Sequence, residues 1–204
     1  MMRLACLAPL AVLALAACEQ AQEPASAPPV AGAPAAPVTP APAADPNVLT
    51  AEGMGPVRIG MTTAEVTAAW GTDANPDAVG GAELEVCDEY HPANAPAGVR
   101  VMIEEGRLTR IAASRDATVK TDRGFGVGDS ATAIKQAYGG AVIAQPHKYQ
   151  DAPAEDLFAW SRGGSTNYVQ DPAARGVRYE IGSDGKVMTV MAGGPSIQLV
   201  EGCS

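Results

Sequence analysis

The chain of 204 residues holds two histidines, and each has carboxylates close by in the sequence. Asp88 and Glu89 precede His91, and Asp151 follows His147. Imidazole and carboxylate groups are common metal ligands, so these residues are the first candidates for a metal site. There is, however, no HExxH motif and no closely spaced histidine pair, and each histidine stands next to a proline. We therefore expect two solvent-exposed loop histidines and no bound metal.

Other patterns give equally little support for catalysis. The glycine-rich run 124–128 precedes an expected helix, but no Lys-Ser/Thr pair follows it, as it would in a phosphate-binding loop. Glu104 and Glu105 are adjacent, and neighbouring strand residues point to opposite faces, so they are not a catalytic carboxylate pair. The nucleophile motif GxSxG is absent. We expect no catalytic residue and no cofactor. A hydrolase site assembled from residues far apart in the sequence is the less favoured alternative.

Three aromatic residues, Tyr90, Tyr149 and Trp160, fall in expected loops or at the ends of expected strands. Large rigid aromatic side chains often anchor protein interfaces, and loops carry many binding residues. The three are therefore candidate binding residues, with burial at the ends of core strands as an alternative of equal weight. Trp70 and Tyr138 have helical spacing from apolar residues and are assigned to the core.

The first residues have the pattern of an export signal. Arg3 is followed by an apolar run over residues 4–17, too short for a membrane-spanning helix of about 20 residues. The run ends in Leu15-Ala16-Ala17-Cys18, which resembles the lipobox of bacterial lipoproteins. The resemblance implies a signal peptide over residues 1–17 and lipid, including palmitate, on Cys18. An ordinary cleavage site of the AxA type is the alternative.

The charge of the chain limits its partners. The formal net charge is −9 and the pI is about 4.6, with the basic residues scattered. Nucleic acids require a basic surface, so we expect no nucleic-acid partner. Anionic lipid headgroups would also repel the chain, so its membrane contact is expected to be the lipid anchor. Glu19 stands where aspartate retains enterobacterial lipoproteins in the inner membrane, which favours the outer membrane, facing the periplasm.

The lipobox also divides the four cysteines. Cys6 would leave with the signal peptide and Cys18 would carry lipid, which leaves Cys87 and Cys203. In an oxidising periplasm this pair is expected to form a disulfide. A catalytic or redox thiol is the alternative, although the chain has no CxxC motif.

A tether is expected between the lipid and the folded domain. Residues 19–48 contain 8 prolines and 10 alanines, a composition that buries too little apolar surface to fold. We therefore expect a disordered tether over residues 18–48 and one folded domain over residues 49–204.

The expected domain contains two similar pairs of segments. Residues 60–71 and 128–139 match at an offset of 68, each with a Thr or Ser N-cap and a terminal glycine, and each predicts a short helix. Residues 98–111 and 176–190 each predict a β-hairpin, because apolar positions alternate on both sides of a glycine-containing turn. Further strands are expected over residues 83–90, 141–143, 157–160 and 196–200.

The repeated order of helix and hairpin predicts an α+β domain of two tandem repeats, about 53–115 and about 124–204. The run Gly60-Met61-Thr62-x-x-Glu65-Val66, ending in Trp70-Gly71, resembles the start of outer-membrane lipoproteins of the BamE (SmpA/OmlA) type. A tandem pair also resembles the β-lactamase inhibitory protein, although that family has a disulfide in each repeat. These resemblances imply helices packed on an antiparallel sheet.

The function that the resemblances imply is non-catalytic protein binding in the cell envelope. The chain would be an accessory of outer-membrane assembly or an inhibitor of a periplasmic enzyme. The alternative is small-ligand binding in a cleft between the repeats.

Overall fold

The computed structural model describes residues 45, 47–78 and 80–203. The expected signal peptide, the lipid site Cys18 and nearly all of the expected tether lie outside these residues. Strand β1 (Val48–Thr50) begins one residue before the expected domain boundary, and Leu49 is fully buried. Within the described part of the chain, no helix is long and apolar enough to cross a membrane.

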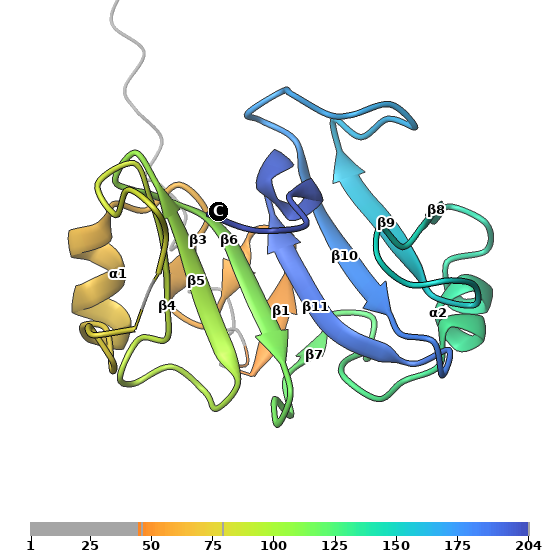
Figure 1. Ribbon diagram of the computed structural model, residues 1–204, viewed down its shortest axis with the longest axis horizontal. Coiled ribbons are helices and arrows are strands. Elements are labelled where there is room, and N and C mark those ends of the chain that lie inside the picture. Colours follow the sequence, from red (N-terminus) through yellow and green to blue (C-terminus); the bar gives the residue numbers. More distant parts are fainter. Residues whose placement is uncertain (1–44, 46, 79, 204) are drawn as a thin grey trace, which may run out of the picture. The chain divides into compact units, whose positions relative to one another are not determined.

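Most of the domain is β structure, with a seven-stranded sheet, a four-stranded sheet and two short helices (Figure 1). The seven-stranded sheet is antiparallel, and its strand order is β4-β5-β6-β11-β10-β9-β8. The α+β prediction therefore holds in a loose sense, with far more strand than helix. The strands of this sheet are β4 (Cys87–Tyr90), β5 (Val99–Glu104), β6 (Arg107–Ser114), β8 (Ile143–Pro146), β9 (Glu155–Arg162), β10 (Arg175–Ile181) and β11 (Val187–Gly193).

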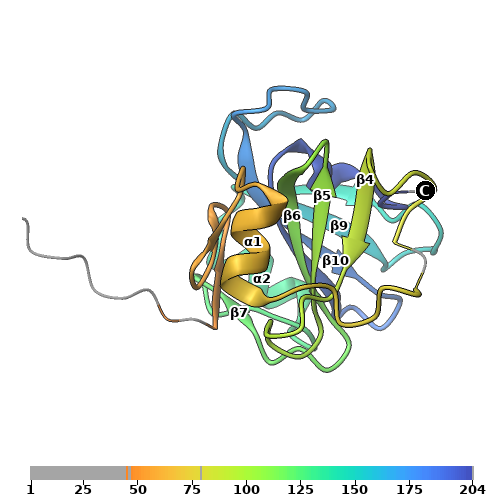
Figure 2. The same cartoon turned by 90° about the vertical axis from the view of Figure 1, so that its left-hand side faces the viewer.

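The small sheet and both helices cover one face of the seven-stranded sheet, and the C-terminal segment, residues 194–203, lies on the other face (Figure 2). In the small sheet, β1 pairs antiparallel with β2 and parallel with β7, and β3 lies outside β2. The bounds of the remaining elements are β2 (Gly53–Met54), β3 (Val57–Arg58), β7 (Lys120–Thr121), α1 (Thr63–Trp70) and α2 (Ala131–Ala137).

Alternation along the strands sorts the side chains between the two faces. Val99 and Val101 of β5 and Tyr179 of β10 pack in the main core together with Val66 of α1 and Ile134 of α2. A second cluster lies on the opposite face, beneath the C-terminal segment. Its buried members are Phe158, Met191 and Ile197.

Both helices begin where the matched segments predict, but their caps differ. The Thr62 side chain accepts a hydrogen bond from the Glu65 N–H, and the Glu65 carboxylate accepts one from the Thr62 N–H, which completes a capping box. These bonds hold the pKa of Glu65 below its ordinary value. Ser130 occupies the same place before α2 but makes no side-chain cap bond.

We predict that Thr62→Ala lowers the free energy of unfolding by about 1 kcal/mol, because it removes an N-cap acceptor. Ser130→Ala is the matched control and should cost only a few tenths of that, since the Ser130 side chain caps nothing. Urea denaturation of both variants measures the difference. Equal losses would contradict this assignment of the caps.

Each helix start is joined to a hairpin turn by the same set of backbone hydrogen bonds. In the first half, Gly60 N–H donates to Leu108 O, Leu108 N–H to Met61 O and Thr63 N–H to Gly106 O, at 2.7, 2.8 and 3.1 Å. In the second half, Gly128 N–H donates to Val187 O, Val187 N–H to Asp129 O and Ala131 N–H to Gly185 O, at 2.9, 2.9 and 3.0 Å. Between the two sets, corresponding residues at the helix starts are 68 positions apart, and corresponding residues at the hairpin turns are 79 positions apart.

Three expected strands are wrong in whole or in part. Residues 196–200 do not form a last strand, because Pro195 begins a 3-10 helix over Pro195–Gln198 that leaves the sheet. The expected strand over 83–90 begins only at Cys87, since Glu83 O accepts the N–H groups of Val86 and Cys87 in a turn. In the second half, the strand expected over 141–143 is largely wrong, since β8 begins only at Ile143, whereas the strand expected over 157–160 lies within the longer β9.

Candidate functional site

Two buried arginines hold the C-terminal segment on the face opposite the helices. Arg110 of β6 donates to the carbonyls of Ser196 and Leu199 at 3.1 and 3.0 Å. Arg178 of β10 donates to the Ile197 carbonyl at 3.2 Å. The two arginines come from opposite halves of the sheet, so the segment spans its centre (Figure 1).

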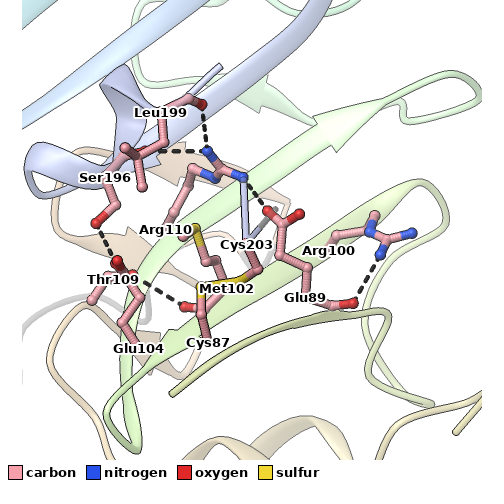
Figure 3. The surroundings of a disulfide bond; sticks show 10 residues. All are labelled: Cys87, Glu89, Arg100, Met102, Glu104, Thr109, Arg110, Ser196, Leu199 and Cys203. Atoms are coloured by element: carbon pink, nitrogen blue, oxygen red, sulfur yellow. Dashed lines mark hydrogen bonds and ion pairs between the residues drawn. A yellow bond between two sulfur atoms is a disulfide. The ribbon is translucent and has the colours of Figure 1, made fainter. Parts of the chain in front are cut away.

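Each of these arginines has a carboxylate partner on another strand of the sheet, that of Arg178 on the adjacent strand β9 and that of Arg110 on β4, two strands away. Arg178 Nε donates to Asp156 Oδ1 at 2.9 Å, and Nη2 lies equally close to that oxygen without hydrogen-bond geometry. Arg110 pairs with Glu89 (Figure 3). The Arg178 and Asp156 side chains are only 1% and 7% exposed. Burial raises the pKa of Asp156 above its ordinary value, although the charge of Arg178 opposes this.

The disulfide between Cys87 and Cys203 confirms the expected pairing. It joins β4 to the end of the C-terminal segment across 116 residues, with the Cα atoms 5.3 Å apart (Figure 3). Ser196 donates to the Glu104 carboxylate of β5. The segment is therefore fixed at both its start and its end.

Side-chain bonds also tie the C-terminal segment to the β9–β10 loop. Gln198 Oε1 accepts the Val169 N–H, and Gln198 Nε2 donates to Val169 O, both at 2.8 Å. The segment is thus held by the two halves of the sheet and by this loop.

A cleft of about 570 Å³ opens beside the start of the C-terminal segment. Its lining from the first half includes Ile59, Val86, Glu104, Arg107 and Leu108. Its lining from the second half includes Gln170, Pro172, Arg175, Pro195 and Ser196. Its volume falls within the range of about 300–1,000 Å³ that is usual for ligand pockets.

The two arginines of the cleft already have partners within the protein. Arg107 donates to Gly60 O at 2.9 Å, and the Glu65 carboxylate lies within its electrostatic reach. Arg175 donates to the carbonyls of Pro172 and Ala174 at 2.8 and 2.7 Å. Arg175 Nε also lies 3.7 Å from the Glu52 carboxylate. The arginines therefore mainly shape the walls of the cleft.

The structure separates the three candidate aromatic residues. Tyr90 is 6% exposed and belongs to the main core, which agrees with the alternative of burial at the end of a core strand. It lies on β4, at the opposite end of the seven-stranded sheet from β8 and the loop that holds Tyr149. Tyr149 is 60% exposed, and Trp160 is half-buried, 6.3 Å from the Phe158 ring. A single aromatic anchor site is not formed, and binding by Tyr149 or Trp160 stays a prediction.

Both histidines lie in loops as expected, but the expected exposure is wrong for His147 and only partly met by His91. His147 is buried: its Nδ1 accepts the N–H groups of Tyr149 and Gln150, which leaves the Nε2 proton for Glu180 at 3.1 Å. Half-buried His91 bonds through Nδ1 to Val99 O at 2.6 Å. Within the part of the chain that the structure describes, neither imidazole is hydrogen-bonded to a hydroxyl or a thiol. Over residues 45, 47–78 and 80–203, no group of three potential ligands is placed to hold a metal ion.

Both edges of the seven-stranded sheet are protected against the addition of a strand. At β4, the N–H groups of Cys87 and Glu89 already donate to Glu83 O and Gly80 O. Strand β8 has four residues and ends at Pro146, which lacks an N–H group. A partner would therefore be bound by side chains and the cleft rather than by extension of the sheet.

The arginine–carboxylate pairs were not predicted from the sequence. Arg110 and Arg178 alternate with apolar residues along their strands, which is the pattern of a solvent-exposed face. One signal was present, since Asp156 directly precedes the apolar pair Leu157-Phe158 within an expected strand region.

The chain matches no protein-family model, no curated protein and no solved structure.

Proposed function

We propose that this chain is a lipid-anchored cell-envelope protein that acts by binding another protein without catalysis. The observation that carries the proposal is the open cleft of about 570 Å³, which joins the two halves of the domain. An exposed apolar segment adjoins it, because Leu84 and Val86 are 55% and 52% exposed. Isolated exposed apolar residues are common, but a pair beside a cleft is typical of interaction sites.

The proposed location rests on two features. The Cys87–Cys203 disulfide favours an oxidising compartment such as the periplasm. The lipobox that ends at Cys18 supplies the proposed anchor, and Glu19 favours the outer membrane. A long Pro/Ala-rich tether would keep the domain at high effective concentration near other envelope proteins.

We also propose that the domain arose by duplication of one helix-and-hairpin unit. The matched backbone bonds between helix start and hairpin turn support this, since their offsets of 68 and 79 are constant within each set. The sheet order supports it too, because each half contributes a hairpin, β5–β6 or β10–β11, and β6 meets β11 at the centre. The likeness to BamE-type proteins and to the β-lactamase inhibitory protein belongs to this proposal.

If Cys18 carries lipid, replacing it should change the cell fraction in which the protein is found. Cys18→Ser should move the protein from the membrane fraction to the soluble periplasmic fraction and abolish labelling by an alkyne analogue of palmitate. Each buried methylene contributes about 0.8 kcal/mol, so two or three acyl chains anchor durably. Cys6→Ser is the matched control and should leave both readouts unchanged. A Cys18→Ser protein that stays in the membrane fraction and keeps its label would contradict lipidation.

Chemical crosslinking in cells, followed by affinity purification, tests the binding function. The wild-type chain should capture a specific envelope protein, and Cys18→Ser should capture far less of it, because the anchor sets the local concentration. If neither form captures a protein, the binding function fails.

A second candidate function is the binding of a small ligand in the cleft. The volume of the cleft favours it, as do the mixed polar and apolar residues of its lining. A ligand present at 100 times its Kd would stabilise the fold by about 2.7 kcal/mol. A screen of melting temperature against envelope metabolites separates this function from protein binding.

A further inference from the structure

The cleft and the segment before β4 form one continuous surface. Val86 lines the cleft, and its carbonyl accepts the N–H of Glu105, in the turn of the β5–β6 hairpin, at 2.9 Å. The segment 83–86 is therefore fixed against this hairpin. Leu84 and Val86 stay more than half exposed there. This surface, made of the cleft and residues 83–86, is the docking surface considered below.

The docking surface is acidic around its apolar part. Glu83 and Glu85 alternate with Leu84 and Val86 along the segment, and Glu105 lies in the adjoining hairpin turn. In the described part of the chain, the carboxylates of Glu83, Glu85 and Glu105 make no hydrogen bond or ion pair. Glu104, which lines the cleft, adds a fourth carboxylate. It accepts a hydrogen bond from Ser196, and within the described residues it forms no ion pair.

The basic residues nearby do not offset these carboxylates. Arg175 lies beside the carboxylate of Glu52, and Arg107 acts on that of Glu65. Both guanidinium groups also donate to backbone carbonyls. Even if both guanidinium groups are counted in full, two positive charges stand against four carboxylates, so the net charge of the docking surface is negative, as is the formal net charge of the chain, −9.

We infer that the docking surface binds a cationic amphipathic segment of a partner protein. An apolar side chain of that segment would occupy the cleft and cover Leu84 and Val86, while lysine or arginine side chains face Glu83, Glu85 and Glu105. Charge complementarity of this kind raises the rate of association and selects the partner. The inference rests on the proposed binding function and names its surface and its class of partner.

The test uses the exported full-length chain with Cys18→Ser and a fluorescent eight-residue peptide of alternating lysine and leucine. Fluorescence anisotropy should show binding with a Kd on the order of 10 μM. The glutamate–leucine and lysine–serine peptides should bind at least about tenfold more weakly, because each lacks one of the two complementary features. Equal binding of all three peptides would overturn the inference.

Variants then locate the binding. Leu84→Ser/Val86→Ser should weaken the lysine–leucine peptide about tenfold, and Glu83→Gln/Glu85→Gln about threefold, with the second effect shrinking at high salt. All four side chains are exposed, so the melting temperature should stay unchanged. Tyr168→Ser removes a similarly exposed side chain elsewhere and should bind as before. If Leu84→Ser/Val86→Ser binds the peptide as wild type does, or if the tyrosine control loses as much affinity, the assignment of binding to the docking surface is wrong.

Crosslinking in cells separates this inference from the binding function. Wild-type chain should capture its partner, and Leu84→Ser/Val86→Ser should capture much less. If both forms capture the same protein equally, the docking surface is wrong while the binding function stands. If neither captures a protein, the binding function fails and the surface with it.

Discussion

Replacement of Cys87 and Cys203 by serine should lower the free energy of unfolding by about 2–5 kcal/mol and the melting temperature by about 5–15 °C. The disulfide closes a loop across 116 residues, so its loss frees a large part of the unfolded chain. It also releases the end of the C-terminal segment. Thermal and urea denaturation of the exported protein measure both quantities.

The single variants supply the control for this prediction. Cys87→Ser and Cys203→Ser should each cost nearly as much as the double variant, because either change breaks the same bond. A double variant within about 1 kcal/mol of wild type would mean that Arg110 and Arg178 hold the segment without the covalent link.

Arg178→Leu should cost about 3–5 kcal/mol, because it leaves the buried Asp156 carboxylate without its cation. It also removes the donor to the Ile197 carbonyl. The double variant Arg178→Leu/Asp156→Leu is the matched control. It should recover most of the loss, since apolar replacement of a buried pair is often neutral. Recovery of none of the loss would contradict a cost that arises from an unpaired charge.

The cost of Arg178→Leu should also depend on pH. Burial already raises the pKa of Asp156 in the folded state above the ordinary value of 3.8, and loss of Arg178 removes an opposing influence. A carboxyl that binds its proton more tightly when folded adds a penalty that grows as the pH rises from 3.8 through its folded pKa. Arg178→Leu should therefore approach the double variant at pH 4.5 and fall below it at pH 7.5. A gap that is independent of pH would contradict this account.

Short-range patterns explain why the helices and hairpins could be predicted. The capping box at Thr62 and Glu65 lies within four residues, and the Asp184-Gly185 turn determines its hairpin locally. The cysteine pairing was predictable for a different reason, since the resemblance of residues 15–18 to a lipobox left only two candidates.

The errors concern residues whose environment comes from distant strands. His147 lies in a loop, but it is buried, and its Nε2 contacts Glu180, 33 residues away. The segment after Pro195 leaves the sheet, and its carbonyls accept hydrogen bonds from Arg110 and Arg178. Arg110 precedes its two acceptors by 86 and 89 residues. Tyr90 is buried because β4 pairs with β5 over the main core. No local pattern in the sequence encodes these contacts.

The central claim is that the tethered domain binds an envelope protein, and that it does so at the end of the seven-stranded sheet beside the cleft. Site-specific photo-crosslinking in cells tests this claim most directly. A photoreactive amino acid is placed at Leu84, beside the cleft, or at Asp184, in the β10–β11 turn. That turn lies at the other end of the sheet, because β11 runs from there to Gly193, next to the cleft. The account predicts an adduct with one envelope protein from position 84 and none from position 184. Equal adducts from both positions, or none from either, would contradict it.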